Sequence, residues 1–219
     1  RAAVRLYFHD AGTFDKVSKS FGPNGSIMHS AAELAEPENN FVSENPSAVS
    51  AIKPAHNTIF ADLISLAGVV ATAACPGGPV IPFFVGRKDK TTPDLAANLP
   101  DVNADLTNLL GVFDRMGLTP TEMIALIGSH TAARSGSDAA SLASGFVPGA
   151  PLDTTVDIWD TTYYTETLQP AVPAGTQRLP SDQKMATDPR TSKIFSGFQS
   201  QGKWNGAFSK AMVHLGSLG

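Results

Sequence analysis

The chain has 219 residues, with 16 basic and 20 acidic side chains and a formal net charge of −4. This length suffices for one domain with a large core, and a hydrophobic content of 42% is ordinary for a globular protein. No run of Lys or Arg could follow a phosphate backbone or an anionic lipid surface, so we expect neither nucleic acid nor membrane as a partner. The longest apolar stretch, residues 63–75, is interrupted by polar residues and too short to cross a bilayer, which predicts a buried core helix.

Helical patterns dominate from the first residues onward. Arg5, Phe8 and His9 are spaced i, i+3 and i+4, so a helix would place a guanidinium, an aromatic ring and an imidazole on one face. Asn57 can cap a second helix running toward Cys75. Apolar residues then recur at spacings of three and four over 106–116, and Gly117 ends that amphipathic helix.

The next helix has the strongest start signal in the chain. Thr119, Pro120 and Glu122 supply an N-cap, a proline at the first helical position and a capping-box glutamate, and the helix runs toward His130. Residues 208–215 carry one apolar face of a C-terminal helix. Residues 14–26, 88–100 and 135–151 are rich in turn formers and are predicted to be ordered loops, so the fold class is mainly α.

Each histidine taken alone has an ordinary interpretation. His9 can be a hydrogen-bonded histidine near a helix end, with Phe8 in the core and Arg5 extending to solvent. His130 can be a core histidine, although its small neighbours in residues 127–131 (IGSHT) would let a planar group such as haem approach the backbone. A second function class, a helical interaction domain with structural histidines, is therefore open at this point.

The combination of motifs is more specific than any one of them. Residues 5–10 (RLYFHD) and 125–131 (ALIGSHT) resemble the distal and proximal signatures of plant-type haem peroxidases, and other family segments follow in order. These are residues 85–89 (VGRKD), 99–100 (LP), 151–155 (PLDTT) and 179–182 (LPSD). The resemblance implies a single haem peroxidase domain over 1–219, with haem b between a distal and a proximal helix. Residues 8–11 (FHDA) and 83–89 (FFVGRKD) look most similar to the secreted fungal class II branch.

On the distal face, the resemblance makes His9 the base that moves a proton between the two oxygens of hydrogen peroxide. Arg5 would stabilise the departing negative oxygen, with Phe8 beside them, and Asn39 resembles the asparagine that orients the distal imidazole. On the proximal face His130 would ligate iron, and Asp182 would accept its second ring proton.

Two further residues are assigned to the haem surroundings. Arg134, one turn past His130, is expected to face a haem propionate, although an exposed arginine is an ordinary alternative. Pro100 is expected beside the exposed haem edge, where small organic reductants would give up electrons.

The resemblance also implies calcium. The expected proximal ligands are Thr131, Asp153, Thr155, Ile158 and Asp160. The expected distal ligands are Asp10, Gly22, Asn24 and Ser26, with Asn24 standing where an aspartate is usual, so distal binding should be weaker. Without the wider resemblance, capped turns would explain both clusters.

Two departures from the family narrow the reductant. Ala2 stands where a manganese-binding glutamate is expected, and Leu152 where the cytochrome c peroxidase type carries a radical tryptophan. No tryptophan lies between His130 and Leu152 either, so small phenols are the expected donors to a monomeric, extracellular enzyme. The alternative function is a haem-binding, calcium-stabilised protein without turnover.

The start of the chain is also unusual. Arg1 lies inside an apolar pattern with no helix start signal, and Cys75, the single cysteine, has no internal partner. By resemblance to the secreted branch, Cys75 would pair with a cysteine preceding Arg1, so we expect an N-terminal segment and a disulfide outside this sequence.

Overall fold

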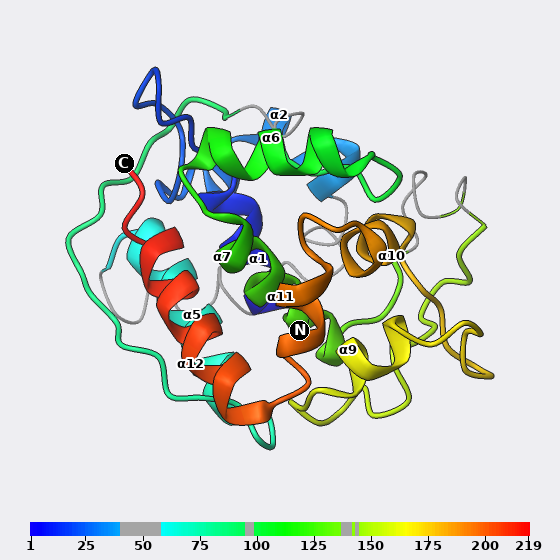
Figure 1. Ribbon diagram of the computed structural model, residues 1–219. Coiled ribbons are helices and arrows are strands. Elements are labelled where there is room, and N and C mark those ends of the chain that lie inside the picture. The colour runs from blue at the N-terminus through cyan, green and yellow to red at the C-terminus, as the bar shows by residue number, and fades with distance from the viewer. Residues whose placement is uncertain (40–57, 95–98, 137–141, 143–144) are drawn as a thin grey trace.

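The computed structural model describes residues 1–39, 58–94, 99–136, 142 and 145–219. Within these ranges the regular structure is helical, and strand-like pairing is confined to two isolated bridges, Asp15–Ser20 and Arg134–Pro151. The mainly α prediction is confirmed (Figure 1). None of the helices in these ranges is long and apolar enough to cross a membrane.

Helix α1 (Ala2–Ala11) packs against α5 (Phe60–Ala74). The contact is close because Gly68 of α5 lies against the ring of Tyr7. The stretch predicted as a buried helix is indeed helical, but it is only partly buried, since Leu66 is 39% and Val70 55% exposed. The helix begins after Ile59, and the predicted cap at Asn57 lies outside the described residues.

Helix α6 (Leu106–Met116) begins at Asp105, whose side chain accepts a hydrogen bond from the Asn108 amide, and it ends at Gly117 in the left-handed conformation, with φ of 86°. Helix α7 (Pro120–Ile127) begins with the predicted capping box between Thr119 and Glu122. It then tightens into the 3-10 segment η4 (Gly128–Ala132), so His130 lies one element beyond the α-helix that was expected to carry it.

The remaining elements are mostly short and were not predicted from the sequence. They are η1 (Ser26–Met28), α2 (Ala31–Leu34), η2 (Pro37–Asn39), α9 (Thr162–Thr167), α10 (Pro180–Thr187) and α11 (Ser192–Gly197). The C-terminal helix α12 (Gln201–Leu215) was expected and starts earlier than residue 208.

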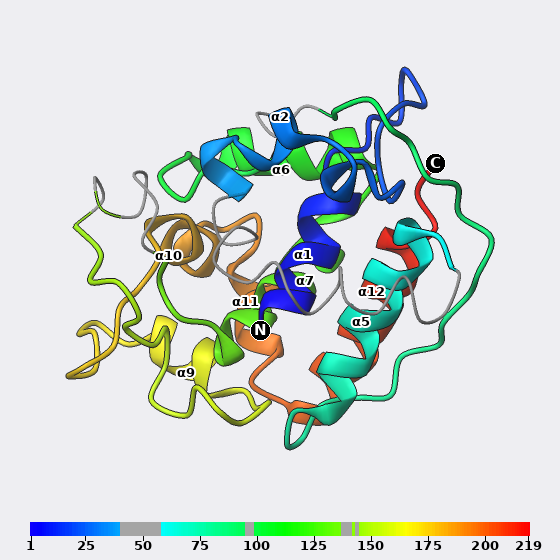
Figure 2. The same ribbon diagram turned by 180° about the vertical axis from the view of Figure 1, so that it is seen from behind.

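Helices lie on two sides of a central pair. Figures 1 and 2 show α5 and α12 on one side, α9 and α10 on the other, and α1 and α7 between them. Helix α12 packs directly against α7, and α9 packs against η4. The elements that carry His9 and His130 are therefore held in the interior by packing on both sides.

Candidate active site

The distal residues form a connected hydrogen-bond chain. Arg5 and His9 lie one turn apart on α1, and Nε of Arg5 lies 3.3 Å from Nε2 of His9. Nδ1 of His9 lies 2.9 Å from Oδ1 of Asn39, whose amide nitrogen donates to the Glu33 carbonyl oxygen at 2.9 Å. Because the Asn39 oxygen can only accept, Nδ1 of His9 carries the ring proton and Nε2 keeps its lone pair.

Burial fixes this arrangement. His9 is 9% exposed and Asn39 is 1% exposed, and η2 delivers the asparagine to the imidazole. The ring of Phe8 meets that of His9 edge-on, with centroids 6.2 Å apart. The four predicted distal residues are thus brought together, and Asn39 contacts His9.

The proximal imidazole is held by a carboxylate instead of an amide. Nδ1 of His130 lies 2.7 Å from Oδ2 of Asp182, which is 1% exposed in the first turn of α10. Ser181 donates to the other carboxylate oxygen at 2.8 Å. Nδ1 of His130 is therefore the donor, and Nε2, which makes no hydrogen bond within the described ranges, is left with a lone pair for a metal.

Tyr163 is a third member of the proximal group that the sequence analysis missed. Its hydroxyl donates to the same Asp182 oxygen and lies 3.3 Å from Nδ1 of His130. Burial and the neighbouring carboxylate of Asp182 raise the pKa of Tyr163 well above its usual value, so the phenol remains a donor. No local pattern could have identified it, because residue 163 reaches His130 only through the packing of α9 on η4.

Gly128 has a different role from the one predicted. A Cβ atom at this position would lie 2.4 Å from Nε1 of Trp204 and 2.4 Å from the Tyr164 hydroxyl. The indole donates to the Ala125 carbonyl oxygen and the phenol to that of Ile124. The small residue therefore serves the protein's own packing, and the interpretation that it leaves space for a planar ligand was wrong for Gly128.

The five predicted proximal calcium ligands converge. Oγ1 of Thr131 lies 2.6 Å from Oδ2 of Asp153, 3.4 Å from Oδ1 of Asp160 and 3.5 Å from the Ile158 carbonyl oxygen. Thr155 reaches the same Asp160 oxygen at 3.0 Å. Asp153 is fully buried, and burial raises its pKa to about 6, as expected for a carboxylate without a neighbouring cation.

At the distal cluster, one carboxylate oxygen of Asp10 lacks a hydrogen-bond partner among the described residues. Its Oδ1 accepts from the Gly25 amide at 2.9 Å, whereas Oδ2 is buried with no hydrogen-bond partner. Burial is the main cause that raises the pKa of Asp10 well above its usual value, and the negative charge of Glu33 adds to this effect. The Gly22 amide donates to the Thr13 hydroxyl at 3.0 Å.

The other two predicted distal ligands contact carboxylates. The Asn24 amide nitrogen donates to Asp94 at 2.9 Å, and the Ser26 hydroxyl donates to Glu33 at 3.1 Å. Lys90 places its ammonium 2.5 Å from the second Asp94 oxygen. A positive side chain thus already lies at this cluster, and the sequence analysis did not anticipate it.

Two predicted haem contacts gain no direct support. Arg134 donates to the Gly149 carbonyl oxygen at 3.1 Å and lies 4.0 Å from Asp157, with 38% of its side chain exposed. Pro100 is partly buried beside Leu99, whose side chain packs on Gly12. Both assignments stay predictions.

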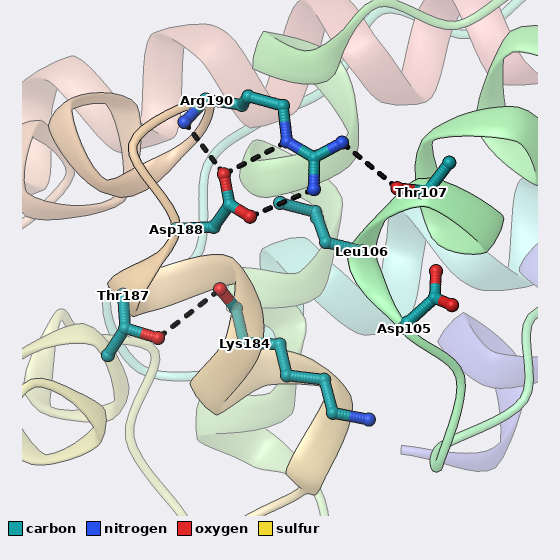
Figure 3. A pocket seen from close by; sticks show the side chains of 7 residues that line it. All are labelled: Asp105, Leu106, Thr107, Lys184, Thr187, Asp188 and Arg190. Carbon is teal, nitrogen blue, oxygen red and sulfur yellow. Dashed lines mark hydrogen bonds and ion pairs between the residues drawn. The ribbon is translucent and has the colours of Figure 1, made fainter.

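An open pocket of about 310 Å³ lies between the N-terminus of α6 and the end of α10 (Figure 3). Its charged groups are already paired: Arg190 binds Asp188 through two hydrogen bonds and Thr107 through a third. Lys184 donates to the carbonyl oxygens of Asn103 and Ala104. None of the predicted site residues lines this pocket. We interpret the hydrogen bonds around it as structural contacts that hold the ends of α6 and α10 together.

Comparison with known proteins identifies the family. The family model named Peroxidase matches residues 1–201. L-ascorbate peroxidase 2, cytosolic, of Arabidopsis thaliana is 37% identical over 187 residues, which cover 85% of this chain and 71% of that protein. Manganese peroxidase 3 of Phlebia radiata is 33% identical, over 99% of this chain and 65% of that protein. The Peroxidase of Arthromyces ramosus is 30% identical, over 100% of this chain and 65% of that protein.

The chain therefore belongs to the peroxidase family. More narrowly, it is a peroxidase of the plant-type superfamily, as its motifs indicated. The chain spans less than two thirds of the length of several relatives, including the Phlebia protein. Proteins with ascorbate and manganese peroxidase names match at similar identity, so the secreted fungal branch stays a prediction.

Proposed function

We propose that this chain is a haem peroxidase that reduces hydrogen peroxide with His9 and Arg5 and ligates the haem iron through His130. One observation carries the proposal. In both imidazoles Nδ1 donates to an oxygen acceptor, which leaves the lone pair of Nε2 for proton transfer or metal binding. The acceptors differ: His9 is held by the neutral amide of Asn39, and His130 by the carboxylate of Asp182.

The difference between the two acceptors supports the two proposed roles. A carboxylate makes the imidazole that donates to it more electron-rich, and a ligand of that kind stabilises a metal in a high oxidation state. An amide orients the ring without adding charge, which suits a base that must take up a proton and release it again.

The residues present fit haem. His130 lies on a short 3-10 segment, its Nε2 makes no hydrogen bond to the residues that the structure describes, and its Nδ1 is fixed by a buried carboxylate. When bound, haem supplies the iron at which peroxide is reduced by two electrons.

The work of the chain's own residues is proton transfer and charge stabilisation. Nε2 of His9 takes the proton from one peroxide oxygen and delivers it to the other, so both protons leave with one oxygen as water. Arg5, whose Nε lies 3.3 Å from that nitrogen, supplies positive charge where the departing oxygen becomes negative. Peroxide replaces His9 as the partner of the Arg5 guanidinium during this step.

We also propose that the proximal oxygen cluster holds calcium. Two carboxylates, two hydroxyls and a carbonyl are hard oxygen ligands, and within the described residues the hydrogen-bond partners of the buried Asp153 are Thr131 and Thr155, neither of which is positively charged. The ion would tie the residue after His130 to the segment before α9 and so position the iron ligand. The distal cluster fits calcium less well, since the side chains of Asn24 and Ser26 bind carboxylates and Lys90 already supplies charge.

Small phenols at the haem edge remain the proposed reductants. We also propose that the protein is extracellular and that Cys75 forms a disulfide. Support for the disulfide is positional. Burial raises the pKa of the Cys75 thiol and the charge of the Arg1 side chain lowers it, so this cysteine lies near the start of α1. Because two relatives are named cytosolic and peroxisomal, the location of this protein must be determined by experiment.

The test is a set of three histidine variants loaded with haem. His9→Leu should keep the haem absorption spectrum but slow peroxide reduction by about 10²–10⁴-fold, because a positioned base contributes that factor. His130→Ala should instead change the iron ligation seen in the spectrum. His29→Gln is the matched control, since this histidine also bonds a carboxylate, Asp89 at 2.9 Å, but belongs to neither group.

Loss of the protein ligand to iron in the His9 variant would show that the two histidines are reversed. Normal haem binding without peroxide consumption by the unaltered protein would favour the alternative, a haem-binding protein without turnover.

A further inference from the structure

A positively charged side chain lies at the distal cluster, where the sequence predicted a calcium ion. The Lys90 ammonium lies 2.5 Å from one carboxylate oxygen of Asp94, whose side chain is fully buried, and 4.7 Å from the centroid of the Phe21 ring. The Lys90 backbone amide donates to the Asn24 carbonyl oxygen at 2.9 Å. The backbone and the side chain of Lys90 therefore both contact the cluster.

Asp94 is the carboxylate through which this positive charge acts. Its second oxygen accepts hydrogen bonds from the Thr13 hydroxyl at 3.0 Å and from the Asn24 amide nitrogen at 2.9 Å. Its backbone amide donates to a carboxylate oxygen of Glu33 at 2.9 Å. Asp94 thus joins the segment after α1, the Asn24 loop and α2. Because a buried carboxylate is costly unless a positive charge compensates it, the Lys90 ammonium stabilises this junction.

The oxygens that were predicted to bind calcium here already accept hydrogen bonds within the protein. The side-chain oxygen of Asn24 accepts from the Ser26 amide at 3.0 Å, and the Gly22 carbonyl oxygen accepts from the Asn24 amide at 2.7 Å. One carboxylate oxygen of Asp10 is buried with no hydrogen-bond partner among the described residues. Calcium takes about six to eight oxygen ligands, so this one oxygen is far from enough, and the cluster does not fit the ion.

The acidic side chains at the cluster are not arranged around one point. Asp10, Glu33 and Asp94 are each 1% exposed. They are tied into the fold by neutral donors, such as the Gly25 amide for Asp10 and the Ser26 hydroxyl for Glu33. In the part of the chain that the structure describes, no three His, Cys, Asp or Glu side chains are placed to share a metal ion. The arrangement is a hydrogen-bond network with one ammonium instead of a metal cage.

We propose that Lys90 is the built-in cation of the distal cluster and takes the place of a calcium ion there. Two features of the sequence act in the same direction. Asn24 removes one negative charge from the expected calcium ligands, and Lys90 adds one positive charge to the same cluster. The proposal goes beyond the proposed peroxidase function and does not depend on it, because it concerns the source of positive charge at this cluster.

This cluster supports the proposed distal base by two routes. Asp10 follows His9 directly on α1. The backbone carbonyl oxygen of Glu33 accepts a hydrogen bond from the Asn39 amide, whose oxygen in turn orients the His9 ring. With Lys90 in place, this support needs no ion from solution. We therefore expect a calcium chelator to act on the proximal oxygen cluster and to leave the distal hydrogen bonds unchanged.

The first test separates the charge of Lys90 from the size of its side chain. Lys90→Met removes the charge and should lower the midpoint of thermal unfolding by roughly 10 °C, because Asp94 then stays buried without a positive partner. Lys90→Arg keeps the charge and should recover most of this loss. Lys16→Met is the matched control, since Lys16 also lies 2.7 Å from an aspartate, Asp114, but the two side chains are 41% and 75% exposed. That change should lower the midpoint by no more than about 4 °C.

The second test asks whether removing the ammonium creates a calcium site. Calcium binding is measured by isothermal titration calorimetry in the Asp153→Asn protein, which lacks the proposed proximal site and should bind no calcium. Adding Asn24→Asp and Lys90→Gln together should create one calcium site, because the cluster gains a carboxylate and loses its cation. Asn24→Asp without Lys90→Gln should create none, since the ammonium remains. If Asp153→Asn does not fold, the same pair of changes in the otherwise unaltered protein should raise the number of bound calcium ions by one.

Three results would overturn the proposal. They are calcium binding to the Asp153→Asn protein that Asp10→Asn abolishes, a folded protein with both Asn24→Asp and Lys90→Gln that gains no calcium ion, and equal losses of thermal stability in Lys90→Met and Lys16→Met. None of these measurements needs haem or peroxide. A protein that does not react with peroxide therefore overturns the peroxidase function alone and leaves the role of Lys90 to be decided by calcium binding and unfolding.

Discussion

Replacing Gly128 by alanine should destabilise the protein through overlap at the centre of the core. The added Cβ would lie 2.4 Å from Trp204 Nε1 and 2.4 Å from the Tyr164 hydroxyl, where an ordinary contact needs at least 3.4 Å. The indole and the phenol must therefore move by roughly 1 Å, and overpacking of this kind costs about 1–3 kcal/mol. Movement also weakens their hydrogen bonds to Ala125 and Ile124, each worth about 1 kcal/mol. We expect a total of about 1–5 kcal/mol, measured as the change in the free energy of unfolding in urea.

Gly111→Ala is the matched control for this prediction. Gly111 lies on the exposed face of α6, and an added Cβ would meet nothing within 4 Å. The same chemical change should therefore stabilise the protein by about 0.5–1 kcal/mol, because alanine is the better helix former. Equal effects of the two substitutions, in sign and size, would refute the packing argument.

Two further outcomes are expected. Burial alone would raise the pKa of Glu122, but hydrogen bonds from the backbone and hydroxyl of Thr119 and from His214 lower it below 4.5. The folded carboxylate thus adds stability above pH 4.5 that is lost as the pH falls through the lowered pKa. Glu122→Gln should therefore lower the free energy of unfolding in urea by about 1 kcal/mol near neutral pH, and by progressively less in acid. Calcium at about 100 times its dissociation constant should add about 2.7 kcal/mol to the unaltered protein and nothing to Asp153→Asn, as read by thermal unfolding; equal stabilisation of both would contradict the proximal site.

Features that depend on neighbouring residues in the chain could be predicted from the sequence. The capping box at Thr119 and Glu122 involves residues three apart, and the left-handed turn at Gly117 requires a glycine, so both followed from local chemistry. The shared face of Arg5 and His9 follows from helical periodicity alone. The pairings of His9 with Asn39 and of His130 with Asp182 had no such local basis and came from family resemblance.

Features that depend on tertiary packing could not be predicted. Tyr163 lies 33 residues from His130, and its role appears only when α9 packs on η4. Lys90 and Asp94 join the distal cluster from a loop whose composition indicated only turns. Short helices such as α9 and α11 lack strong caps and long apolar periods, and they form because the core orders them.

The position of the proposed iron ligand depends on the packing around Gly128. Trp204 and Tyr164 meet Gly128, two residues before His130. Because these contacts hold the 3-10 segment that carries His130, a substitution at Gly128 should disturb the iron spectrum as well as the stability. A change at Trp159, which stacks on Trp204 one ring further away, should leave the ligand in place.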